Sequence, residues 1–158
     1  MKRYYSYNEF IHDMILLVRK FGRFTPDTIV AVSRGGITIG HFLSEYLNIR
    51  NFYIIKSISY EDDKKLEGIK ISDIPHISDS KNILIVDEIV DSGQTLQKIT
   101  ELLTLTYPDI YFKSATIFQK ESASFKADFF INQSEDWIEF FWEVDMKRSL
   151  REVLKESL

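Results

Sequence analysis

The chain has 158 residues, 44% of them hydrophobic and 28% charged, which is typical of one globular domain with a sizeable core. It contains no cysteine, which excludes disulfides, thiolate metal sites and cysteine nucleophiles, and favours a cytoplasmic location. The net charge of −4 argues against a nucleic-acid partner, and no apolar segment suits an integral membrane contact or a secretory signal.

The first predicted elements are a helix, a strand and a second helix. Apolar residues at helical spacing predict a packing helix over residues 7–21, which ends at Gly22. A short apolar strand over residues 28–32 then runs through the turn S-R-G-G at 33–36 into a helix over 37–47. Such a turn suits an anion, because backbone N–H groups and the positive end of the helix dipole face it. Alone, it is equally typical of an ordinary strand-to-helix connection.

A strand and a charged segment follow. Residues 51–59 predict a second strand, and residues 60–68 are polar enough to form a solvated hairpin. Residues 69–77 predict a return strand, which Pro75 confines to the edge of a sheet because proline lacks the N–H that a central strand needs.

The largest group of candidate functional residues lies at residues 82–96, in the segment N-I-L-I-V-D-E-I-V-D-S-G-Q-T-L. Its apolar run predicts a buried parallel strand that ends at the acidic pair Asp87-Glu88. Asp91 and a small-residue loop then lead into a helix over residues 96–105. Ligands of open α/β sheets bind beyond the carboxyl ends of the strands, so these three carboxylates lie where such a fold binds its ligand.

The last third contains two strands, over residues 111–118 and 128–131, an aromatic and acidic segment at 136–143, and an amphipathic helix over 146–158. This helix is expected either to pack on its own domain or to contact another subunit. The repeated strand–helix alternation predicts an α/β fold with a mostly parallel sheet flanked by helices, in one domain over residues 1–158.

Two segments resemble a known family. D-E-I-V-D-S-G-Q-T-L at residues 87–96 resembles, at every defining position, the motif by which type I phosphoribosyltransferases bind 5-phosphoribosyl 1-pyrophosphate (PRPP). Trp137-Ile138 and the residues after it resemble a segment of small microbial xanthine-guanine and related 6-oxopurine phosphoribosyltransferases. The resemblance implies the type I phosphoribosyltransferase fold, with a mobile lid over about residues 59–79 and a small hood whose base-binding segment covers about residues 120–145.

The implied activity is transfer of the 5-phosphoribosyl group of PRPP to guanine, xanthine or hypoxanthine in purine salvage, with release of pyrophosphate. Mg²⁺ is the implied cofactor, and a homo-oligomer, either a dimer or a tetramer, is the implied assembly. Two alternatives are a non-enzymatic regulator that binds PRPP and a phosphoribosyltransferase that acts on a pyrimidine base. Lys120 and the Trp137 segment favour the purine enzyme.

The resemblance also implies how PRPP is bound. The turn at Arg34 and Gly35 would hold the pyrophosphate, with a cis peptide bond between these two residues, and Lys64 or Lys65 of the lid would add a positive charge. Asp87 and Glu88 would contact the ribose hydroxyls and coordinate Mg²⁺, directly or through water. The residues implied to bind PRPP are Arg34, Gly35, Lys65, Asp87, Glu88, Asp91, Ser92, Gly93, Gln94 and Thr95.

For the base, the resemblance implies four residues. Asp91 would act as the general base toward N7 of the purine, and Lys120 would contact its O6 atom. Trp137 would stack on the ring, and the backbone of Ile138 would read the edge of the base.

Overall fold

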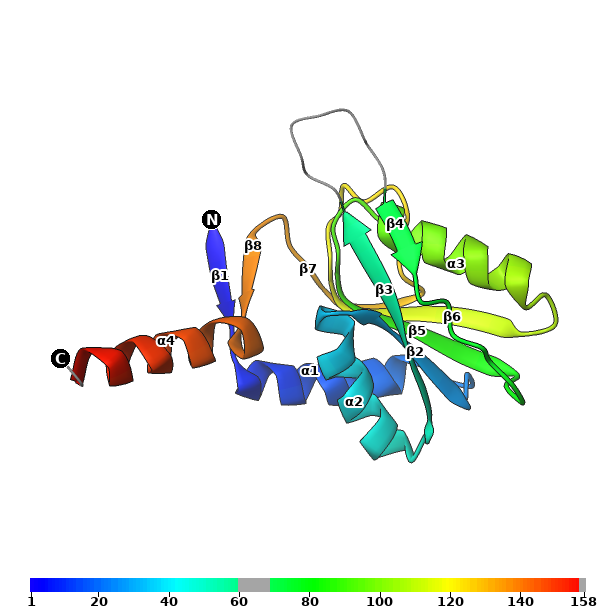
Figure 1. Cartoon of the computed structure of the whole chain (residues 1–158), viewed down its shortest axis with the longest axis horizontal. Coiled ribbons are helices and arrows are strands. Elements are labelled where there is room, and N and C mark those ends of the chain that lie inside the picture. Colours follow the sequence, from blue (N-terminus) through cyan, green and yellow to red (C-terminus); the bar gives the residue numbers. More distant parts are fainter. Residues whose placement is uncertain (60–68, 157–158) are drawn as a thin grey trace.

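The computed structural model describes residues 1–59 and 69–156, with the backbone alone at residues 58, 59 and 151–156 (Figure 1). In chain order the elements are β1 (Lys2–Tyr5), α1 (Tyr7–Lys20), β2 (Thr28–Ser33), α2 (Gly35–Leu47), β3 (Asn51–Ser59), β4 (Ile69–Ser72), β5 (Asn82–Val90), α3 (Gln94–Thr106), β6 (Tyr111–Gln119), β7 (Phe129–Gln133), β8 (Trp137–Phe140) and α4 (Phe141–Glu156). Each helix and strand predicted between residues 7 and 131 is present. The C-terminal helix begins five residues earlier than predicted, at Phe141.

The main sheet has the strand order β4-β3-β2-β5-β6-β7. All neighbouring pairs are parallel except β3 and β4, which are antiparallel. This arrangement confirms the predicted α/β fold. The edge position of β4 agrees with the prediction from Pro75, and the strand ends at Ser72, before that proline is reached.

Helices cover both faces of the main sheet, which explains the continuous apolar run of β5. Leu84 and Val86 pack in the same cluster as the apolar residues of α1 and α2. Ile83 and Ile85 point to the opposite face and pack with those of α3. Successive strand residues point to opposite faces, so a strand covered on both sides must be apolar at every position.

A second, two-stranded parallel sheet pairs β1 with β8, with Lys2 opposite Trp137 and Tyr5 opposite Phe140. In Figure 1 these two strands lie side by side, apart from the main sheet. No strand was predicted in the first residues of the chain. We call the sheet of β1 and β8 the hood, because β8 lies within the segment that was predicted to form one.

Helix α4 follows β8 without a break and extends away from the rest of the protein in Figure 1. Its side chains Met146 and Leu150 are 79% and 58% exposed. The expectation that this helix packs on its own domain is therefore wrong for these two residues. Among the described residues, no helix is both long enough and apolar enough to cross a membrane.

Candidate active site

The carboxyl ends of β2, β5 and β6 meet at one edge of the main sheet, because β5 pairs with both other strands in parallel. This edge brings together the turn after β2, the acidic pair near the end of β5 and Lys120, which follows β6. These residues therefore meet at the edge of the sheet at which open α/β folds bind their ligands.

The β2–α2 turn is in direct contact with β5. A Cβ atom on Gly35 would lie 1.9–2.3 Å from the carboxyl atoms of Glu88, and one on Gly36 would lie 2.3 Å from the backbone oxygen of Val86. Both distances are shorter than any non-bonded contact allows, so a side chain at Gly35 would displace the end of the Glu88 side chain, and one at Gly36 would displace backbone. The turn predicted to bind an anion and the predicted acidic pair therefore form one continuous surface.

The cis peptide bond of this turn joins Ser33 and Arg34, one residue earlier than predicted. The prediction placed it at Gly35, where the missing side chain relieves crowding. Gly35 is already the first residue of α2, and Arg34 occupies the N-cap position with helical backbone angles. The turn is therefore completed before the glycine is reached.

The acidic pair carries negative charge that the described residues do not balance. Oδ1 of Asp87 accepts the Glu88 N–H at 2.9 Å. Burial away from water, and then the neighbouring Glu88 carboxylate, raise the pKa of Asp87 well above its usual value. Oε2 of Glu88 is buried and has no hydrogen-bond partner in the described part of the chain. Two adjacent carboxylates, one with a raised pKa and one with a buried oxygen that lacks a partner, favour a bound cation.

A cation here would take few ligands from the protein. Within residues 1–59 and 69–156, no group of three or more His, Cys, Asp or Glu side chains is arranged to hold a metal ion. Mg²⁺ commonly binds through one or two carboxylates together with substrate phosphates and water, so Asp87 and Glu88 fit this ion.

The loop at residues 91–95 is fixed against the segment that follows β6. Gly93 has a φ of 88°, which favours glycine, and a Cβ atom there would lie 2.2 Å from the backbone oxygen of Phe125. Ser124 donates its N–H and its hydroxyl to the backbone oxygen of Ser92, at 3.0 and 2.9 Å. Helix α3 begins at Gln94, so Ser92, Gly93, Gln94 and Thr95 lie at its positive end, where anions bind.

A cavity of about 320 Å³ lies between this loop and the hood. Nζ of Lys120 lies 2.6 Å from Oδ1 of Asp91, and this contact raises the pKa of Lys120. The Trp137 side chain is 70% exposed, whereas Ile138 is 5% exposed. The cavity is lined by Glu88, Ile89, Asp91, Lys120, Glu135, Asp136, Trp137, Ile138, Phe140 and Glu143. All four residues predicted to bind the base therefore lie around one cavity, which Glu88 also reaches.

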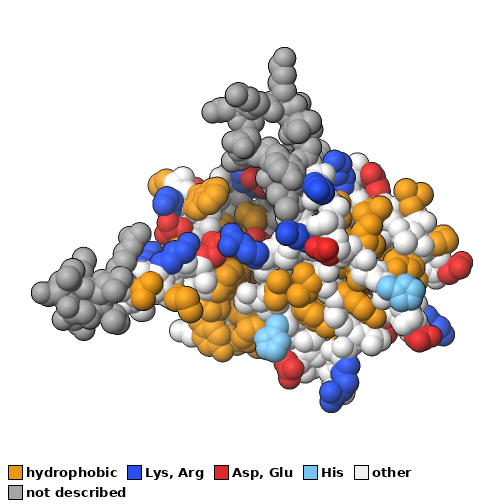
Figure 2. All heavy atoms as spheres, viewed as in Figure 1, with side chains coloured by type: hydrophobic (Ala, Val, Ile, Leu, Met, Phe, Trp, Pro, Cys, Tyr) orange, Lys and Arg blue, Asp and Glu red, His pale blue; other side chains and the backbone are white. Residues whose placement is uncertain are grey.

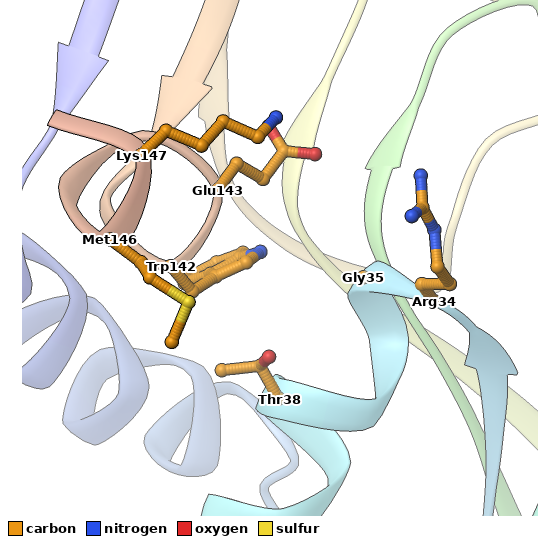
Figure 3. A pocket seen from close by; sticks show the side chains of 7 residues that line it. All are labelled: Arg34, Gly35, Thr38, Trp142, Glu143, Met146 and Lys147. Atoms are coloured by element: carbon orange, nitrogen blue, oxygen red, sulfur yellow. The ribbon is translucent and has the colours of Figure 1, made fainter. Parts of the chain in front are cut away.

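A second cavity, of about 360 Å³, lies between the β2–α2 turn and α4, as Figure 3 shows. Trp142 points toward the start of α2, and Glu143 lines both this cavity and the first one. The lining residues are Arg34, Gly35, Thr38, Trp142, Glu143, Met146 and Lys147. No contact between the last helix and this turn was predicted, and Trp142 and Glu143 lie ahead of the predicted helix start at Met146. The lid lysines Lys64 and Lys65 lie outside the described residues.

The family follows from comparison with known proteins. Residues 11–149 match the family model of the phosphoribosyl transferase domain. The chain belongs to the phosphoribosyltransferase family. A xanthine-guanine phosphoribosyltransferase of Ruegeria sp. (strain TM1040) is 30% identical over 156 residues, which cover 90% of this chain and 85% of the relative.

Solved phosphoribosyltransferase structures agree with the fold. The xanthine-guanine-hypoxanthine phosphoribosyltransferase of Helicobacter pylori superposes with a TM-score of 0.91 at 44% identity, covering 96% of this chain and 99% of that one. A purine phosphoribosyltransferase from Pyrococcus horikoshii Ot3 gives a TM-score of 0.77 at 27% identity, covering 90% and 94% of the two chains. The type I phosphoribosyltransferase fold inferred from the sequence is confirmed.

Proposed function

We propose that this phosphoribosyltransferase transfers the 5-phosphoribosyl group of PRPP to a 6-oxopurine, namely guanine, xanthine or hypoxanthine, in purine salvage. The observation that carries the proposal is the single cavity that Asp91, Lys120, Trp137 and Ile138 line together beside the acidic pair. The names of the relatives from Ruegeria and Helicobacter support the same class of base.

In this proposal the ribose and phosphates of PRPP lie along the carboxyl edge of the sheet. The 5′-phosphate binds at the loop of residues 92–95, where backbone N–H groups and the hydroxyls of Ser92 and Thr95 surround it at the start of α3. The pyrophosphate binds at the turn of Arg34 and Gly35, with Lys65 of the lid as a further contact and Lys64 as the alternative. Asp87 and Glu88 contact the ribose hydroxyls.

Mg²⁺ is part of the proposal, held by Glu88 and Asp87 directly or through water, and it would neutralise the charge of the leaving pyrophosphate. The unpartnered Glu88 oxygen and the raised pKa of Asp87 support this placement. The ion also suits the hard oxygen ligands that a carboxylate pair and a diphosphate offer.

The base would bind with its ring against Trp137 and its O6 atom at Lys120. The new bond joins a ring nitrogen of the base to C1 of the ribose as the bond from C1 to pyrophosphate breaks. As this nitrogen forms its bond, the purine loses a proton, and Asp91 accepts or orients the proton at N7. Nζ of Lys120 lies 2.6 Å from Oδ1 of Asp91, and this pairing holds the Asp91 carboxylate at the cavity.

The deciding experiment is incubation of the purified protein with PRPP, Mg²⁺ and one of six bases. Nucleotide is expected with at least one of guanine, xanthine and hypoxanthine, and with none of adenine, uracil and orotate. Nucleotide formed only from uracil or orotate would identify a pyrimidine enzyme. If no base is consumed and PRPP still raises the melting temperature, the chain is a PRPP-binding regulator.

The lid assignment has its own test. Lys65→Ala is expected to raise the KM for PRPP and to leave the KM for the purine unchanged, with Lys64→Ala as the matched control. The reverse result would move the assignment to Lys64.

We also propose a homo-oligomer, a dimer or a tetramer, in the cytoplasm. Figure 2 shows hydrophobic side chains on the face over α1 and α2 and at the start of α4. A groove of about 210 Å³ between α1 and α2 has apolar walls that include the exposed Ile15 and Tyr46, and α4 exposes Leu150. Light scattering is expected to give a dimer or tetramer mass, which Leu150→Glu reduces and which Leu105→Glu, on α3, leaves unchanged. A monomer mass for the unaltered chain would refute the assembly.

A further inference from the structure

A buried carboxylate outside both cavities has no part in the proposed chemistry. Asp13 of α1 is 8% exposed. One oxygen, Oδ2, accepts a hydrogen bond from the hydroxyl of Tyr5 at 2.8 Å and another from Nδ2 of Asn132 at 2.6 Å. Burying a carboxylate without partners costs free energy, and the two hydrogen bonds offset this cost for Asp13.

The two donors lie on either side of the segment that lines the base cavity. Asn132 belongs to β7, ahead of the cavity residues Glu135 to Ile138. Tyr5 belongs to β1 and lies opposite Phe140, which follows them. One carboxylate oxygen on α1 therefore connects to both ends of the segment that carries Trp137.

The ring of Tyr5 joins the two strands that supply the base site. It contacts Phe118 edge-on, with ring centroids 4.9 Å apart at an interplanar angle of 84°. It contacts Phe140 in the same way, at 5.9 Å and 86°. Phe118 lies in β6, two residues before Lys120, which follows the strand. Phe140 lines the base cavity from β8. Such pairs add to the energy of burial and have a defined geometry.

Strand β8 is anchored by the buried side chains of Ile138 and Phe140, and its backbone is paired on one side. In the described part of the chain its only strand partner is β1, and the Trp137 N–H donates to the backbone oxygen of Met1 at 3.0 Å. The Trp137 side chain is 70% exposed, so packing does not fix its position. The backbone of β8 determines where this ring faces the cavity.

We propose that Tyr5 and Asp13 are positioning residues for the base site: their hydrogen bond holds β1, and through it β8, at the distance from Lys120 that a purine ring requires. The inference rests on the proposed purine function. Neither residue lines either cavity, so the proposal expects PRPP binding to change little when they are altered.

The test is Tyr5→Phe, which keeps the ring contacts and removes the hydroxyl. Loss of one hydrogen bond to a carboxylate is expected to raise the KM for the purine about three- to tenfold, while the KM for PRPP changes less than about twofold. Tyr4→Phe is the matched control. Tyr4 lies in the same strand and also donates to a carboxylate, that of Asp145 at 2.8 Å, but its side chain is exposed and lines neither cavity. Its purine KM should not change.

Hydrogen exchange gives a readout that does not need activity. In Tyr5→Phe the amides of residues 132–140 should exchange faster than in the unaltered chain or in Tyr4→Phe. An unchanged purine KM in an active enzyme overturns the inference, as does equal weakening of purine and PRPP. If the unaltered chain uses no purine, the proposed function fails, and unchanged exchange in residues 132–140 would then refute the positioning role separately.

Discussion

The ammonium group of Lys120 lies 2.6 Å from a carboxylate oxygen of Asp91, so the residue proposed to bind O6 and the residue proposed as general base form one ion pair. The Asp91 side chain is 69% exposed, so the pair adds little to stability, and its value lies in fixing two groups at the cavity. The chemistry of the site should therefore respond to changes at Asp91 much more than its folding does.

The first prediction concerns Asp91→Asn. The amide keeps the shape of the side chain but cannot accept the purine proton, so kcat should fall by about a hundredfold or more. The KM for PRPP should change less than about threefold, because the phosphate loop and the acidic pair are intact. Steady-state kinetics with each substrate varied in turn measure both effects. Asp109→Asn, on the exposed loop before β6, is the control, and unchanged turnover in Asp91→Asn would remove Asp91 from this role.

The second prediction separates two adjacent glycines. In Gly35→Ala the new Cβ meets the end of the Glu88 side chain, which can rotate away. The protein should stay folded but lose affinity for PRPP and Mg²⁺, because the displaced carboxylate belongs to their site. In Gly36→Ala the Cβ meets the backbone oxygen of Val86, which cannot yield, and unfolding should become easier by about 1–3 kcal/mol.

Urea unfolding and PRPP-dependent thermal shifts distinguish the two variants. Equal loss of stability in both would show that Glu88 is held as rigidly as the backbone. Unimpaired PRPP binding in Gly35→Ala would separate Glu88 from the ligand site.

The PRPP motif could be predicted from local sequence, because its strand, loop and helix follow one another from Ile83 to Leu96. The fold needs only to place this continuous segment at an edge of the sheet. The hood could not be predicted in this way, because its two strands are far apart in the sequence. Strand β1 has four residues, too few for a clear alternation, and its partner Trp137 lies 135 residues away from Lys2. Tyr5 becomes buried only when these distant segments meet, so no local pattern predicts its burial.

The cavity beside Arg34 was missed for a related reason. Apolar spacing is regular from Met146 onward and therefore predicts a last helix that starts there. The structure continues the helix back to Phe141, where Phe140 and Trp142 stack with ring centroids 4.5 Å apart. Glu143, the residue after Trp142, lines both cavities, and a helical pattern alone does not show which tertiary neighbours an aromatic residue will contact.

The third prediction tests Trp137 as the surface on which the base stacks. Because the side chain is 70% exposed, Trp137→Ala should leave the melting temperature nearly unchanged. Loss of stacking should raise the KM for the purine roughly tenfold to a hundredfold, and Trp137→Phe should have a smaller effect. Tyr111→Ala is the control, because Tyr111 is an exposed aromatic residue at the end of β6 that lies away from Lys120. A purine KM that does not change in Trp137→Ala would place the base elsewhere.

The fourth prediction concerns the residue that follows Tyr5. Ser6 caps α1: its N–H and its hydroxyl both donate to Oε2 of Glu9 at 2.8 Å, and these bonds lower the pKa of Glu9. A lowered pKa means that the ionised form stabilises the fold. This stabilisation is present above the unfolded value of about 4.3 and is lost as the pH falls through the lower folded value.

Glu9→Gln should therefore lower the urea midpoint at pH 7 and match the unaltered chain near pH 3. Glu45→Gln makes the same charge change at an exposed site of α2 and should show no such trend. If the urea midpoint of Glu9→Gln were lower by the same amount at every pH, the charge of Glu9 would not contribute to stability. The ionised capping box would then have no part in fixing the junction between β1 and α1.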